Sequence, residues 1–171
     1  MIRYDTGVNA GFHPDSFGGN LNRVVGNRFN SALGGPLLMS NRVFSLTVFP
    51  ANSGLQSVSV ASGPTSMGTA MVLDFLAANM VANQFNTVQF SPPVFVGPEF
   101  LGLFLGTFGS TQPVGLVGMS DMGTQGQGFH AIEGFYLQGL ATMLAPVPNR
   151  NAMLRARIDV FPVELMDFEI R

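Results

Sequence analysis

The segment Gln84–Gly106 constrains the fold of this chain most strongly, because short apolar runs alternate there with glycine and proline. Its first residues place alternate side chains on opposite faces of an extended strand. We expect Pro92 and Pro93 to end that strand, since neither can donate a ladder hydrogen bond. The run Phe100–Leu105 is apolar on both faces, which is typical of a strand buried deep in a stack of sheets. The segment therefore predicts a strand, a proline corner and a second strand.

Comparable short runs recur along the rest of the chain, with turn signals between them at roughly 8–12-residue spacing. This pattern predicts an all-β sandwich or barrel, and a length of 171 residues predicts one domain. Further strands are expected at residues 2–5, 23–29 (with a bulge at Gly26), 37–49, 55–61, 114–119, 129–133, 135–140 and 153–161.

Residues 69–82 are the exception to the strand pattern. Thr69–Leu76 fits either a strand or a helix, and Ala77–Ala82 favours a helix. We therefore expect one short helix near residues 74–82 in an otherwise all-β fold.

The chain is unusually poor in charge. Charged residues make up 11% of the sequence, where roughly 25% is usual for globular domains. All eight basic residues are arginine, and the sequence contains no cysteine. A weakly charged surface tends to self-associate. We therefore expect a surface covered by copies of the chain or by neighbouring domains, or a neutral surface that faces the extracellular medium.

Several classes of function lack their sequence signals. Nucleic-acid binding requires a clustered basic footprint, which is missing. The uncharged stretch Phe100–Ser120 is interrupted by glycines and polar residues, so we expect no membrane insertion. His13 and His130 accompany no nucleophile elbow and no paired acid and base. We therefore expect a protein that is not an enzyme.

Calcium is the one metal for which the sequence offers ligands. Loop carbonyls together with Asp5, Asp15 or Asp121 would supply the hard oxygen ligands that this ion prefers. The same aspartates are also common turn residues, so capping of turns is the alternative interpretation. No other cofactor is expected, because there is no thiolate and no phosphate-binding glycine loop before a helix.

Several segments in this order resemble a class of secreted bacterial surface domains. They are YDTG at 4–7, VGNRF at 25–29, the frame from Phe85 to Leu103, GQGFHAIEG at 126–134 and NAMLRA at 151–156. The resemblance implies a jelly-roll-like β-sandwich at residues 1–161, a location outside the cell or at its surface, and no catalytic residues.

The last residues, PVELMDFEI at 162–170, resemble the PVEL-x-SF segment that often follows such domains in exported proteins, with Asp167 in place of serine. The resemblance implies that residues 162–171 form a strand or linker, and that the chain is one domain of a larger exported protein or a relative that ends there. Terminal strands are natural donors for β-augmentation between subunits. The residues expected to contribute to assembly are Ile2, Tyr4, Leu165, Phe168 and Ile170.

The sequence thus leads to a non-enzymatic extracellular module with a structural or adhesive role. Its expected partners are copies of itself, in a homopolymer, or neighbouring domains of a larger surface protein. One alternative is a calcium-dependent carbohydrate-binding module. Another is a viral capsid or decoration protein, because jelly rolls recur in capsids.

Overall fold

The computed structural model describes residues 1–12, 23–30, 39–62, 76–97, 99–106, 117–121, 128–132, 144–146 and 150–162. Within these ranges the protein is all-β and contains no helix. The strands are β1 (Arg23–Asn30), β2 (Met39–Val48), β3 (Gly54–Ser62), β4 (Leu76–Met80), β5 (Asn86–Val96), β6 (Glu99–Gly106), β7 (Met119–Asp121), β8 (Gly128–Ile132), β9 (Leu144–Pro146), β10 (Arg150–Ala152) and β11 (Leu154–Pro162).

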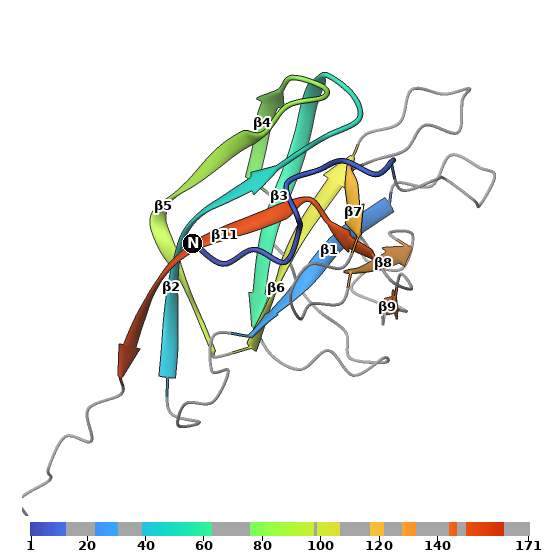
Figure 1. Cartoon of the computed structure of the whole chain (residues 1–171). Coiled ribbons are helices and arrows are strands. Elements are labelled where there is room, and N and C mark those ends of the chain that lie inside the picture. The colour runs from blue at the N-terminus through green and yellow to red at the C-terminus, as the bar shows by residue number, and fades with distance from the viewer. Residues whose placement is uncertain are drawn as a thin grey trace, which may run out of the picture.

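The described strands form three antiparallel sheets, none of which closes on itself (Figure 1). The largest has six strands in the order β4-β3-β6-β1-β8-β9, the second has the order β11-β2-β5, and the third is the pair β10-β7. Sequence neighbours are thus often separated in the sheets. β1, for example, pairs with β6 on one side and with β8 on the other.

The six-stranded and three-stranded sheets share one apolar core. Phe29 and Phe100 stack with their ring centroids 5.1 Å apart, and Leu46 and Leu154 approach from the other sheet. Gly102 on β6 allows this close approach, because a Cβ there would lie 2.7 Å from Leu154 Cδ2 and 3.2 Å from Leu46 Cδ2. Close packing of the two sheets therefore depends on a missing side chain in the central strand.

β6 confirms the expected strand at residues 100–105. Phe100, Gly102 and Phe104 alternate with Leu101 and Leu103, and all five are buried. Both faces of this strand are thus covered, as its uninterrupted apolar run predicted.

The expected end of the preceding strand at the two prolines is wrong. β5 continues through Pro92 and Pro93, and its register with β2 changes there, from Gln89 opposite Ser45 to Val94 opposite Val43. Residues 90–93 are left outside the ladder. A strand tolerates this irregularity because β5 lies at the edge of its sheet, where one side of the backbone has no ladder to maintain.

Two further expectations are corrected. Gly26 forms no bulge, since β1 keeps an unbroken register with β6; the position instead excludes a side chain, because a Cβ would collide with the carbonyl oxygen of Gly102. The helix near residues 74–82 is also wrong: Leu76–Met80 is strand β4 and Ala82 and Asn83 form a turn. Pairing with β3 and burial of Met80 outweigh the helical preference of the alanines.

Some expected elements lie outside the described residues. These are the strand at 135–140 and residues 163–171 of the C-terminal segment. β11 ends at Pro162, next to the expected boundary of the domain.

Candidate functional site

The N-terminal segment 1–12 lies along β11 and β7 of its own chain (Figure 1). Ile2 pairs with Ala156 through two backbone hydrogen bonds, in which Ile2 N donates to Ala156 O at 2.7 Å and Ala156 N to Ile2 O at 3.0 Å. Farther along, Ala10 N donates to Met119 O at 2.8 Å and Met119 N to Gly11 O at 2.7 Å. The strand expected at residues 2–5 is therefore replaced by isolated pairs at both ends of a longer segment.

Tyr4 belongs to the core rather than to the surface. Its ring stacks on Phe29 at a centroid distance of 5.5 Å, and its carbonyl accepts a hydrogen bond from Asn151 Nδ2 at 3.1 Å. Ile2 and Tyr4, two of the residues expected to contribute to assembly, are thus engaged within the chain, and their role between copies stays a prediction. The other three, Leu165, Phe168 and Ile170, lie outside the described residues.

Asp5 forms a buried ion pair with Arg155 on β11. Arg155 Nε donates to Asp5 Oδ2 at 2.9 Å and Nη2 to Oδ1 at 2.6 Å, while Gly7 N donates to Oδ1 at 2.9 Å. The Cζ atom of the guanidinium lies 3.9 Å from the centroid of the Phe85 ring. Such a fork of two parallel bonds fixes orientation as well as charge. The pair therefore fastens the N-terminal segment to β11.

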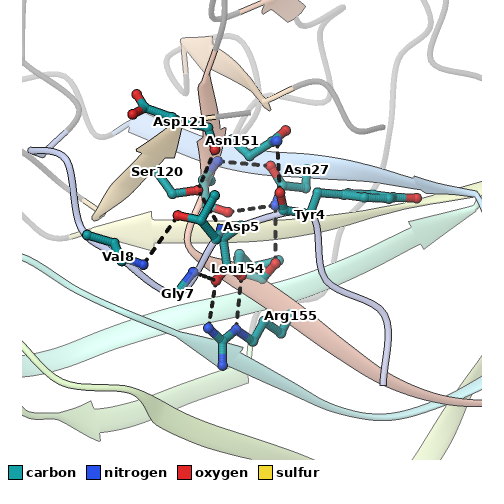
Figure 2. Close-up of polar contacts among 12 residues, drawn as sticks. Tyr4, Asp5, Gly7, Val8, Asn27, Ser120, Asp121, Asn151, Leu154 and Arg155 are labelled. Atoms are coloured by element: carbon teal, nitrogen blue, oxygen red, sulfur yellow. Dashed lines mark hydrogen bonds and ion pairs between the residues drawn. The ribbon is translucent and has the colours of Figure 1, made fainter. Parts of the chain in front are cut away.

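The aspartates considered for calcium occupy different environments. Asp121 is exposed at the end of β7, one residue after Ser120, whose Oγ accepts a hydrogen bond from Thr6 N at 3.2 Å. Asp5 directs its carboxylate toward Arg155 instead, away from Asp121 (Figure 2). Asp15 lies outside the described residues.

Among the residues that the structure describes, no three acidic, histidine or cysteine side chains gather at one point. An ion at Asp5 would also have to displace a paired guanidinium. Calcium binding stays a prediction.

Asn27 on β1 is a structural residue that the sequence pattern did not identify. Its buried side chain behaves like a peptide group: Nδ2 donates to Ala152 O at 2.8 Å and Leu154 O at 3.1 Å, and Oδ1 accepts from Ala152 N at 3.1 Å. It thereby satisfies the backbone where β10 passes into β11. The sequence offered one signal for this role, because Asn27 is a polar residue between the apolar residues of β1.

The outer face of the three-stranded sheet is polar and partly aromatic. The register places Phe95, Arg42 and Asp159 in one row across its strands, and Arg42 Nη2 lies 3.2 Å from Asp159 Oδ2. The guanidinium of Arg42 also lies 4.8 Å from the ring centroid of Phe44. This face therefore carries charged side chains, and the Arg42 cation on it is paired with a carboxylate and an aromatic ring.

Apolar side chains are exposed at the β4 edge, by which we mean strand β4 with the flanking residues Leu55 and Val81. Leu55 on β3 is 59% exposed, Leu76 on β4 is 41% exposed and Val81, directly after β4, is 53% exposed. No charged residue occurs in β3 or β4. The β4 edge is therefore uncharged and exposes apolar side chains beside the polar Asn79.

Comparison with protein-family models, with curated proteins and with solved structures finds no match. In the described part of the chain, no helix has the length and apolar character needed to cross a membrane. Functional inference consequently depends on the geometry of the described surfaces.

Proposed function

We propose that this protein is a non-enzymatic structural or adhesive module with a jelly-roll-like β-sandwich fold, which acts outside the cell or at its surface. Its partners are copies of itself or neighbouring domains of a surface protein. The two packed antiparallel sheets support the sandwich. The resemblance of the chain to secreted surface domains supports the location.

The observation that carries the proposal is the β4 edge. Leu55, Leu76 and Val81 are exposed on or beside β3 and β4, and neither strand carries a charged residue. Exposed apolar surface next to an unpaired strand favours association with another protein. The low overall charge acts in the same direction, because it removes the repulsion that keeps many proteins monomeric.

Sedimentation velocity across a wide range of protein concentrations tests the assembly. We expect species larger than the 171-residue monomer to increase with concentration, and electron microscopy to distinguish a polymer from a small closed oligomer. A single monomeric species at every concentration would contradict the proposal. The location is tested separately, by antibody labelling of intact source cells: staining that requires permeabilisation would count against a surface module.

A further inference from the structure

The free edges of β-sheets invite pairing with other chains, and proteins usually protect them. Two edges in the described part of this protein are covered by its own residues. Ile2 pairs with β11 at Ala156, and residues 10–12 pair with β7 and the adjoining Gly118. The N-terminal segment thus occupies these edges at those positions, and farther along β11 the charged residues Arg157 and Asp159 are exposed.

Three other strands are protected in different ways. β5 carries Pro92 and Pro93 in its irregular centre, and proline cannot donate a hydrogen bond to an added strand. On β10, Asn27 binds both backbone groups of Ala152. β9, at the far edge of the six-stranded sheet, ends in Pro146.

β4 has none of these protections. Its sequence, LAANM, contains no proline, no glycine and no charge. It pairs with β3 and, among the described strands, has no second neighbour. Leu76, Ala77 and Asn79 are exposed. Of the sheet edges that the structure describes, β4 is therefore the one prepared to accept another strand.

We infer that the β4 edges of two copies pair antiparallel about a two-fold axis and join their six-stranded sheets into one. This inference rests on the proposed function and names its interface. A second copy is the partner favoured by the chemistry of the edge. A neutral strand meets its own image without repulsion, whereas a charged partner would gain no opposite charge from β3 or β4.

Full pairing of the five residues has only one antiparallel register, which is centred on Ala78. Ala77 of each copy then lies opposite Asn79 of the other, and Leu76 lies opposite Met80. The small side chains of Ala77 and Ala78 permit close approach of the strands. Leu76 gains an apolar neighbour in place of solvent, and the contact is isologous, so it closes at two copies.

Opposed charges test this register. The variant Ala77→Lys with Asn79→Lys places lysine opposite lysine on both sides of the central Ala78, which is unfavourable in an antiparallel pair. We expect the dissociation constant of the full-length protein, measured by sedimentation equilibrium, to rise by at least about tenfold. Gln84→Lys with Gln89→Lys is the matched control: it adds the same charge at exposed positions away from β4 and should leave association unchanged.

A second variant, Ala77→Glu with Asn79→Glu, provides a rescue. Each variant alone should be monomeric, and their equimolar mixture should form a one-to-one heterodimer. Thermal unfolding verifies that the variants fold. If the double variants do not fold, the single variants Asn79→Lys and Asn79→Glu take their place in the same experiment.

The outcomes separate the inference from the proposed function. Association of the wild type that the lysines do not weaken would overturn the β4 interface and leave self-assembly standing. A wild type that stays monomeric would overturn both. Folded, monomeric lysine and glutamate variants that do not combine would overturn the antiparallel pairing.

Discussion

Replacement of Asp5 by asparagine tests how strongly the N-terminal segment is held. The Asp5 side chain is 0% exposed and that of Arg155 is 15% exposed. Loss of one member of a buried pair costs about 3–5 kcal/mol, because the remaining charge stays buried. Asparagine has nearly the same size and can still accept the hydrogen bond from Gly7 N, so the change isolates the charge. For a chain of this length, each kcal/mol shifts Tm by about 2–4 °C, which predicts a decrease of about 6–20 °C.

Thermal and urea unfolding followed by circular dichroism provide the measurement. The control is Asp159→Asn, which breaks the pair with Arg42 at a side chain that is 54% exposed. Exposed pairs contribute about 0–1 kcal/mol, so this variant should stay close to the wild type. Combining Asp5→Asn with Arg155→Met should recover part of the loss, because no charge remains buried without a partner. The reasoning would be refuted if Asp5→Asn and Asp159→Asn were equally stable.

Three other perturbations have defined outcomes. Gly26→Ala should yield little folded protein in an expression and circular-dichroism assay, because its Cβ would meet the backbone of β6; Gly97→Ala, whose Cβ has its nearest neighbour at 3.8 Å, should fold normally. Asn27→Leu should lower the free energy of unfolding in urea by at least about 3 kcal/mol, since it leaves backbone groups of Ala152 and Leu154 unpaired. A free energy of unfolding equal to that of the wild type would mean that water replaces the amide. Ala77→Lys with Asn79→Lys should weaken self-association by at least about tenfold, as measured by sedimentation.

Strands could be predicted where local pattern and burial agree. The apolar run of β6 lies within Glu99–Gly106, and the alternation of Arg155, Arg157 and Asp159 lies within β11. In both cases the side chains alone indicate which faces are covered. β4 was missed because its alanines suit a helix in isolation, while its strand conformation depends on pairing with β3.

The contacts of the candidate site were beyond local pattern for a different reason. Asp5 and Arg155 are 150 positions apart, and Asn27 and Ala152 are 125 positions apart. Each residue is unremarkable among its sequence neighbours. Their partnership follows from the sheet order, which no run of adjacent residues encodes, so the pattern indicated polar positions but not their partners.

The N-terminal segment has a consequence for synthesis of the chain. Tyr4 and Asp5 are synthesised before their partners Asn151 and Arg155, which follow 147 and 150 positions later. At roughly 5–20 residues per second, that interval is about 8–30 s. During most of it β7 has not been synthesised, and β10 and β11 follow only at its end. The N-terminal segment can therefore dock only once β10 and β11 have been synthesised, and the nascent chain depends until then on whatever protects its apolar strands from aggregation.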